Sequence, residues 1–215
     1  MAISRPVDPA VIARCPSIST RLLVTLAALL LIAGCGPQPY DPGLLRSPGF
    51  GTAEGERRSW TFSHHASTDS YELTIDQGVA AIRRVGPEPW AFLAQMLPEG
   101  SIEQLAGRRL VFAVELRGQL DTTEWGKPFE PTGLLAKMWH RPGDGARGAH
   151  ALLGSERVHS ERLPLPGDAS LPDWKRHTLE FDTPETLSRL QIAIVMSTGG
   201  TLEMRNPSLH IVEPD

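Results

Sequence analysis

The sequence predicts an all-β fold, an antiparallel β-sandwich or jelly roll, for most of the chain. Three observations predict it: short runs of alternating apolar and polar residues recur from residue 58 onward, glycine, proline and aspartate separate them, and helical periodicity is scarce. A period of two places successive side chains on opposite faces of a strand, as a half-buried antiparallel strand requires. Many short strands of this kind in one domain favour two packed sheets.

One run alternates strictly and places Leu110, Phe112 and Val114 on the face expected in the core. A single helical turn is expected over 101–106, with Ser101 as its N-cap. Further strands are expected over 59–62, 71–75, 79–85, 90–97, 133–141, 174–181 and 190–197, with a last hairpin across Gly199-Gly200 to Val212.

The first 34 residues have the pattern of an export signal. Arg5, Arg14 and Arg21 form a basic leader, and an uncharged apolar run follows from Leu22 to Ala33. This run is shorter than the roughly 20 residues that a membrane-spanning helix needs, and a signal h-region has about this length. A short membrane anchor is the alternative interpretation.

The end of this run, Leu31-Ile32-Ala33-Gly34-Cys35, resembles a bacterial lipobox. The resemblance implies cleavage by signal peptidase II before Cys35, acylation of Cys35, and a protein held at the membrane of the cell envelope by its acyl chains. Gly36 after the cysteine, in place of an aspartate, implies the outer membrane by the same resemblance.

Three segments are therefore expected: a lipoprotein signal peptide over 1–34, a lipidated tether over 35–51, and a β-sandwich domain over 52–215. The tether is predicted because proline and glycine are frequent there, which disfavours regular structure. Residues 51–212 are expected to fold on their own.

The composition narrows the function. Cys15 and Cys35 are the two cysteines, so the part that folds offers no thiol for catalysis, a disulfide or a metal. Three of the 21 basic side chains and one of the 25 acidic ones lie before residue 35, so the rest carries a formal charge of −6. This acidity argues against nucleic acid and against electrostatic docking to anionic lipid.

The strand expected over 133–141 has the most distinctive outer face. Lys137, Trp139 and Arg141 fall on the face opposite Ala136 and Met138. If this strand pairs with the one over 109–117, an aromatic ring is flanked by charged groups, which suits the apolar face and hydroxyl rim of a sugar. In the alternative, Trp139 packs in the core and the charges are solvated. The predicted ligand-binding residues are Trp139, Lys137, Arg141, Glu115 and Arg117, with Trp125 reaching in from the loop over 118–132.

The other candidate sites are weaker. Trp60 and Trp174 are expected in or beside the core, and Trp90 at a strand end.

Adjacent His64 and His65 would point to opposite faces of a strand and so could not readily chelate one ion. No acid-rich loop marks a calcium site. Structural calcium is nevertheless the one cofactor that is kept as an alternative. The common hydrolase motifs are missing, but a pair of acids for glycoside hydrolysis stays open.

The later part of the chain resembles galactose-binding-like jelly rolls, and most closely the carbohydrate-binding-module-like domains found beside bacterial regulators and in secreted proteins. The resemblance covers roughly residues 60–212 and implies a β-sandwich that binds carbohydrate. It departs after the closing glycines, where the family often has a tryptophan and an aspartate and this chain has Leu202, Glu203 and Asn206. The matching residues are Gln95, Gly107-Arg108-Arg109, Met138-Trp139-His140-Arg141, Asp173-Trp174, Pro184 and Gly199-Gly200.

Three functions are therefore weighed. The first is a non-catalytic envelope lipoprotein whose β-sandwich binds carbohydrate or a similar polar ligand. The second is a structural or protein-interaction module of the envelope without a small-molecule site, and the third is a hydrolase. Exposure of Trp139 separates the first two, because a sugar can stack only on an exposed indole.

Overall fold

The computed structural model describes residues 41, 43–51, 59–66, 69–121, 131–141 and 156–212, so that Cys35 and Trp125 lie outside the described residues. Within these ranges the chain forms ten strands and one helix. In chain order they are β1 (Thr61–His64), β2 (Tyr71–Asp76), β3 (Val79–Arg84), β4 (Ala91–Met96), α2 (Glu99–Leu105), β5 (Arg109–Asp121), β6 (Gly133–His140), β7 (Arg157–Pro164), β8 (Ser170–Asp182), β9 (Leu187–Met196) and β10 (Gly199–Ile211).

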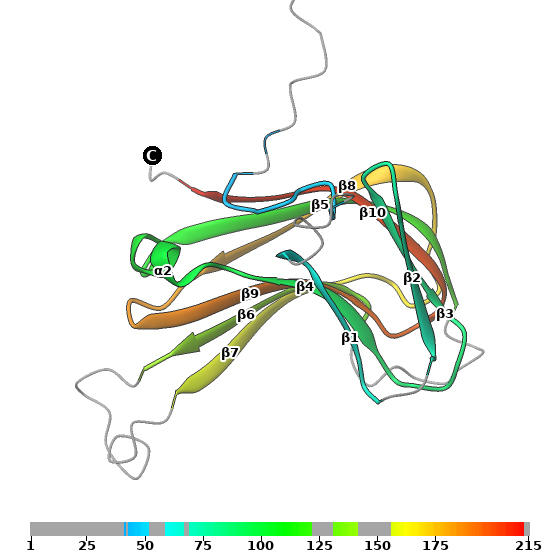
Figure 1. Ribbon diagram of the computed structural model, residues 1–215, viewed down its shortest axis with the longest axis horizontal. Coiled ribbons are helices and arrows are strands. Elements are labelled where there is room, and N and C mark those ends of the chain that lie inside the picture. The colour runs from blue at the N-terminus through cyan, green and yellow to red at the C-terminus, as the bar shows by residue number, and fades with distance from the viewer. Residues whose placement is uncertain are drawn as a thin grey trace, which may run out of the picture. The chain divides into compact units, whose positions relative to one another are not determined.

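The strands form two antiparallel sheets that pack face to face, which confirms the predicted all-β sandwich (Figure 1). Sheet A has the order β2-β3-β10-β5-β8, and sheet B has the order β1-β4-β9-β6-β7. Neighbours along the chain often lie in different sheets, as β5 and β6 do. The predicted closing hairpin is wrong for this reason, because β9 lies in sheet B and β10 pairs with β3 and β5 in sheet A.

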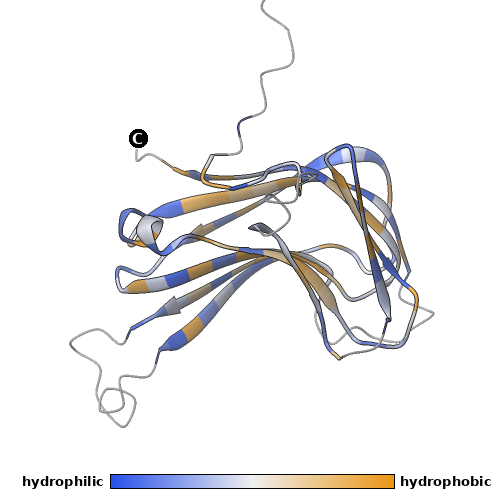
Figure 2. Ribbon diagram, in the orientation of Figure 1, coloured by the Kyte–Doolittle hydropathy of each residue, from blue (hydrophilic) through white to orange (hydrophobic). Residues whose placement is uncertain are grey.

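The core lies between the sheets and follows the predicted alternation. Leu110, Phe112 and Val114 of β5 are fully buried, and Ala136 and Met138 of β6 are buried opposite them in the other sheet. Hydrophobic and hydrophilic residues alternate along the strands (Figure 2). Because neighbouring residues on a strand point to opposite faces, each sheet also presents an outer face, where the functional residues have to be sought.

Two local predictions need correction. The sequence does not suggest β7, because this edge strand has a mostly exposed, polar sequence with little alternation. The helix is α2, and its N-cap is Pro98, which makes no side-chain cap. The Ser101 hydroxyl instead donates a hydrogen bond to the Pro98 carbonyl oxygen over 2.7 Å. Among the described residues, no helix has the length and apolar character that would let it cross a bilayer.

Residues 43–51, which we call the strap, pack against the sandwich. Leu45 and Phe50 are buried and belong to the core, and the Phe50 ring lies 5.0 Å from the Trp60 ring. The buried Gln95 amide holds the strap backbone, accepting from Arg46 N over 2.9 Å and donating to Arg46 O over 2.7 Å. The predicted boundary at residue 51 is therefore wrong, because the domain includes apolar side chains that precede it.

The strap begins alongside β10. Gly43 forms a parallel bridge with Leu209, and Leu44 N donates to Leu209 O over 2.9 Å. Gly43 has a φ of 62°, and a Cβ atom there would lie 2.2 Å from the Leu209 carbonyl oxygen. Only glycine fits this close approach of two backbones.

His177 of β8 is expected to make the stability of the domain depend on pH. Its Nε2 atom is buried without a hydrogen-bond partner among the described residues. Burial, with a smaller contribution from the charge of Lys175, lowers the pKa of His177 below its ordinary value of 6.5. Between the lowered pKa and about 6.5 the unfolded chain binds more protons than the folded one, so stability falls as the pH falls through this window.

We therefore expect the melting temperature to drop on acidification from about pH 7.5 to about pH 5.5, and to drop less in His177→Leu. Thermal denaturation followed by circular dichroism measures both. The control is His140→Leu, which removes a histidine from the end of β6 and leaves His177 in place. Equal acid sensitivity of the wild type and His177→Leu would show that another group is responsible.

Candidate functional site

The outer face of sheet B is hollowed into a groove with a volume of about 450 Å³. Pairing of the strands assembles it, because residues directly opposite one another in an antiparallel pair share a face. One row across the sheet joins Lys137 of β6 to Gln191 of β9 and Ser160 of β7. The residues that line the groove are Trp90, Phe92, Leu135, Lys137, Ser160, Arg162, Gln191 and Val195.

The floor of the groove is apolar. Ala94, Leu135, Ala193 and Val195 form a buried cluster that is separate from the core between the sheets, and Phe92 packs against it. These residues come from β4, β6 and β9, the central strands of sheet B. A floor of small and branched side chains leaves space above it for a flat, partly apolar ligand.

Two aromatic rings stand at one end of the groove. The Trp90 and Phe92 rings are stacked, with centroids 5.2 Å apart and planes inclined by 17°. The His65 ring meets Trp90 edge-on at 5.7 Å. Both stacked rings are half-buried, so part of each aromatic surface remains in contact with solvent.

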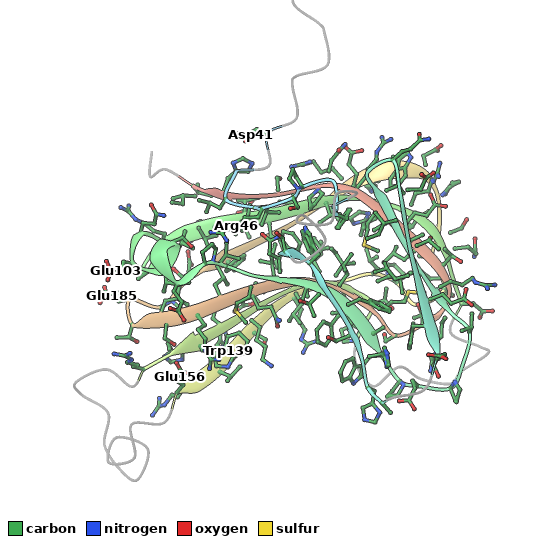
Figure 3. The ribbon with its side chains drawn as sticks, viewed as in Figure 1. Asp41, Arg46, Glu103, Trp139, Glu156 and Glu185 are labelled. Carbon is green, nitrogen blue, oxygen red and sulfur yellow. The ribbon has the colours of Figure 1, made fainter. Side chains whose placement is uncertain are left out.

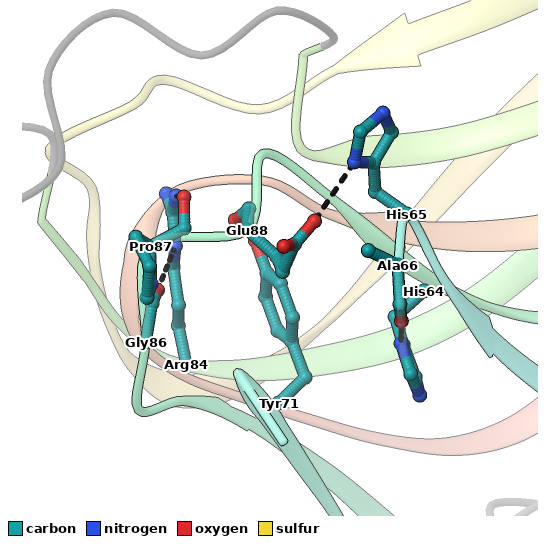
Figure 4. Close-up of polar contacts among 8 residues, drawn as sticks. All are labelled: His64, His65, Ala66, Tyr71, Arg84, Gly86, Pro87 and Glu88. Carbon is teal, nitrogen blue, oxygen red and sulfur yellow. Dashed lines mark hydrogen bonds and ion pairs between the residues drawn. The ribbon is translucent and has the colours of Figure 1, made fainter. Parts of the chain in front are cut away.

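The turn that precedes Trp90 is held by buried polar groups (Figure 4). Arg84, only 7 % exposed, donates to the carbonyl oxygens of Gly86 over 3.0 Å and Pro87 over 3.0 Å. The Tyr71 hydroxyl donates to Glu88 O over 3.1 Å, and burial raises the pKa of Tyr71 to about 12. These bonds fix the backbone that carries Trp90.

Glu88 links this turn to His65, the residue that follows β1. One of its carboxylate oxygens lies 2.8 Å from His65 Nδ1, and His65 N donates to Trp90 O over 3.2 Å. Trp90 therefore has a defined position relative to both β1 and β4, as a binding surface requires.

Trp139 stands beyond the other end of the groove. It is half-buried, and it lies on the side of sheet B turned away from sheet A (Figure 3). Lys137 Nζ lies 5.0 Å from the centre of its ring, and the Arg189 guanidinium carbon lies 4.8 Å from it. Trp139 does not line the groove itself, but Lys137 does. The predicted pairing of Lys137 with Trp139 on one outer face is confirmed.

A carboxylate fixes the surroundings of Trp139. Glu156 accepts a hydrogen bond from the Ser188 hydroxyl over 2.7 Å and forms an ion pair with Arg189. The hydrogen bond from Ser188, followed by that from Arg189, lowers the pKa of Glu156, and the more distant charge of Arg141 acts in the same direction. Arg141 itself is exposed just after β6, where its backbone NH donates to Thr186 O over 3.1 Å.

Glu115 and Arg117 lie elsewhere, on the outer face of sheet A. The expectation that they share a surface with Trp139 is wrong, because β5 pairs with β10 and β8 and not with β6. Arg117 forms an ion pair with Glu203, and Glu115 lies 2.7 Å from Arg205 Nε. Burial would raise the pKa of Glu115, but the hydrogen bonds from Arg205 and Asn206 outweigh it and lower the pKa.

Trp174 of β8 belongs to the same outer face of sheet A and not to the core edge. The guanidinium carbons of Arg117 and Arg205 lie 4.6 Å and 4.3 Å from the centre of its ring. Each of these arginines is also paired with a carboxylate across the sheet. The two outer faces thus carry similar clusters of one tryptophan and two cations, but only that of sheet B adjoins the groove.

The aromatic residues near the two ends of the groove, the Trp90–Phe92 pair and Trp139, lie far apart along sheet B. Phe92 pairs with Val195, which pairs with Gly133, and Trp139 lies six residues further along β6. At about 3.3 Å per residue, this separates the two ends by roughly 20 Å along the strand direction.

Trp90 and Phe92 are not among the binding residues predicted from the sequence. Their signal is the alternation that runs from Trp90 into β4, which places both rings on the face opposite Ala91 and Leu93. Trp90 and Phe92 taken together, as two rings on one outer face, indicate a binding surface better than Trp90 taken alone as a residue at a strand end. Among the described residues, no group of three or more histidine, cysteine, aspartate or glutamate side chains is placed to hold a metal ion.

No protein-family model matches the sequence, and no curated protein sequence matches it. Solved structures match the chain at low identity and low TM-score. A family 61 carbohydrate-binding module in complex with β-1,4-galactotriose has a TM-score of 0.40 and 16 % identity over 80 % of this chain and 100 % of that chain. The C-terminal family 22 carbohydrate-binding module of a Clostridium thermocellum xylanase has a TM-score of 0.38 and 12 % identity, over 74 % and 88 % of the two chains.

The enzymatically active domain of tailspike protein 4 of bacteriophage CBA120 has a TM-score of 0.42 and 14 % identity over 72 % of this chain. This chain spans only 19 % of the length of that tailspike structure. At these values the likeness supports no conclusion about this chain, so a ligand for it has to follow from its own surface residues.

Proposed function

We propose that the outer face of sheet B binds carbohydrate and does not transform it. The stacked pair of Trp90 and Phe92 above an apolar floor carries this proposal. The flat, apolar face of a pyranose ring packs favourably on an aromatic ring, and a half-buried ring is available for that contact. Aromatic rings bind without serving as proton donors or nucleophiles, which supports a binding role.

The polar residues of the groove suit the hydroxyl rim of a sugar. Lys137, Gln191 and Ser160 lie in one row across three strands, and each offers a hydrogen-bond donor. The volume of about 450 Å³ falls in the range of small-molecule sites. The separation of roughly 20 Å between Phe92 and Trp139 favours an oligosaccharide over a single sugar.

The test is a glycan-array screen of the full-length protein in detergent, followed by calorimetry on each glycan that binds. Saturable binding that quenches tryptophan fluorescence is expected, because indole rings lie in and beside the groove. Failure to bind any neutral or acidic glycan would contradict the proposal.

A protein partner is the second candidate, and exposed apolar side chains favour it. Met96 is 44 % exposed and Val158 is 53 % exposed, and both lie on the outer face of sheet B beside the groove. Exposed apolar residues around a groove are typical of protein interaction sites. Cross-linking in cells through a photoreactive residue at position 158 would capture such a partner, while a glycan ligand would give no cross-linked protein.

We also propose that the chain is a lipoprotein of the bacterial cell envelope, anchored through Cys35 in the outer membrane. The lipobox-like sequence before Cys35 motivates this. Since the strap begins at Gly43, only residues 36–42 separate the anchor from the domain. Seven residues span at most about 25 Å, so the domain would stay close to the membrane surface.

The Cys35→Ser variant is expected to lose incorporation of labelled palmitate and to leave the membrane fraction, because the serine hydroxyl cannot take the place of the acylated thiol. Metabolic labelling with membrane fractionation measures both. Cys15→Ser is the matched control, because it removes the other cysteine and should keep label and location. Unchanged labelling of Cys35→Ser would show that Cys35 is not the anchor.

A further inference from the structure

We infer that the groove selects an acidic glycan, whose sugar carboxylates lie over Lys137 and Arg162. This inference rests on the proposed function and adds the class of ligand to it. Among the described residues, the two charged ones that line the groove are both cationic, although the chain as a whole has a formal net charge of −4. Positive charge is thus concentrated where the ligand would lie, against the overall composition.

The two cations are close neighbours on one face. Lys137 of β6 pairs directly with Ser160 of β7, and Arg162 lies two residues further along β7, opposite Leu135. Diagonal neighbours of this kind in an antiparallel pair lie roughly 7–8 Å apart at their backbones, so long side chains can reach one ligand group. Both side chains therefore border the same part of the groove, beside the apolar floor at Leu135.

The Lys137 ammonium is available to a ligand anion. Among the described residues it contacts the Trp139 ring and no carboxylate. The carboxylates at the two ends of this face are engaged elsewhere: Glu156 with Arg189 and Ser188, and Glu88 with His65. A ligand carboxylate would supply Lys137 with an acceptor that the described part of the chain does not.

The uncharged neighbours favour a carboxylate as well. The Gln191 amide and the Ser160 hydroxyl offer donors on both sides of Lys137, and a carboxylate accepts several hydrogen bonds through its two oxygens. Charged pairs of this kind contribute more to the choice of partner than to affinity, and salt screens them. The aromatic rings would then supply most of the binding energy, and the cations would distinguish acidic from neutral glycans.

The experiment compares matched glycans that differ only in charge. Hexasaccharides of polygalacturonate, alginate and hyaluronan are titrated into the full-length protein in detergent, each against its carboxyl-reduced neutral form. We expect at least one acidic form to bind about fivefold or more tightly than its neutral form at low salt, as one exposed ion pair of about 1 kcal/mol provides. The preference should shrink as the ionic strength rises.

The variant Lys137→Gln keeps the length of the side chain and removes its charge, so the preference for the acidic form should weaken about fivefold. The matched control is Lys175→Gln on the exposed part of β8, which should leave the preference unchanged. Loss of preference in Lys137→Gln alone supports the inference.

The remaining outcomes overturn one or both proposals. Equal binding of acidic and neutral forms, or a preference that survives Lys137→Gln, overturns the assignment of acidic glycans to this site and leaves carbohydrate binding in place. Absence of binding to every acidic and neutral form overturns the acidic preference together with the proposed function.

Discussion

Replacing Phe50 by alanine is expected to lower the free energy of unfolding by roughly 3–5 kcal/mol, as much as Phe112→Ala in the centre of the core. Both side chains are fully buried and belong to the same hydrophobic cluster. Loss of the Phe50 ring also removes its contact with Trp60, whose indole nitrogen donates to Ser47 O over 3.1 Å and ties the strap to β1. Urea denaturation followed by circular dichroism measures the change.

The control is Arg46→Ala, which changes an exposed side chain in the same strap and should alter the free energy of unfolding by no more than about 0.5 kcal/mol. Deletion of residues 41–50 should destabilise the domain at least as strongly as Phe50→Ala, because it also removes Leu45. If Phe50→Ala matched Arg46→Ala, the strap would be a tether after all, as the proline and glycine content suggests.

Replacing Trp139 by alanine is expected to weaken glycan binding about twentyfold or more and to leave the fold intact. Truncation of a tryptophan on which a ligand stacks typically costs about 2 kcal/mol or more, and 1.4 kcal/mol is a factor of ten in affinity. Trp139 is half-buried on an outer face, so its removal leaves no core cavity. Calorimetry with the best ligand from the glycan screen measures the affinity, and a thermal melt checks the fold.

Trp174→Ala is the matched control for Trp139→Ala. Trp174 is also half-buried and also lies against two cationic side chains, but on the outer face of sheet A. Its loss should cost about 0.5–1 kcal/mol of stability per cation–π contact and leave binding unchanged. Equal effects of the two variants on binding would place the ligand elsewhere, and unfolding of Trp139→Ala would favour a structural role for that residue.

The alternation of residues along each strand is enough to predict which face of that strand is apolar. The alternation in β6 places Ala136 and Met138 in the core and Lys137 and Trp139 outside, and the structure confirms it. This is possible because the direction of a side chain on a strand depends only on its position along that strand. The resemblance of residues 60–212 to carbohydrate-binding-module-like domains suggested the same architecture before any strand was paired.

Which outer faces come together depends on how the strands pair in the folded domain. Glu115 and Arg117 were expected beside Trp139 because β5 and β6 are consecutive, yet the two strands lie in opposite sheets. Trp90 and Phe92 join Lys137 and Arg162 because β9 lies between β4 and β6, and β7 pairs with β6. Pairing between strands remote in sequence depends on the packing of the whole core, which no local pattern of residues encodes.

The same reason explains the strap. Its prolines and glycines indicate a backbone without regular structure, and the described residues form no strand of their own there. Local composition cannot say whether Leu45 and Phe50 reach a core, because the space that they fill is made by residues far along the chain, including Trp60 and Gln95. The alternation along a strand is local and can be predicted from the sequence, but the contacts of each face and of the strap form only when the two sheets pack.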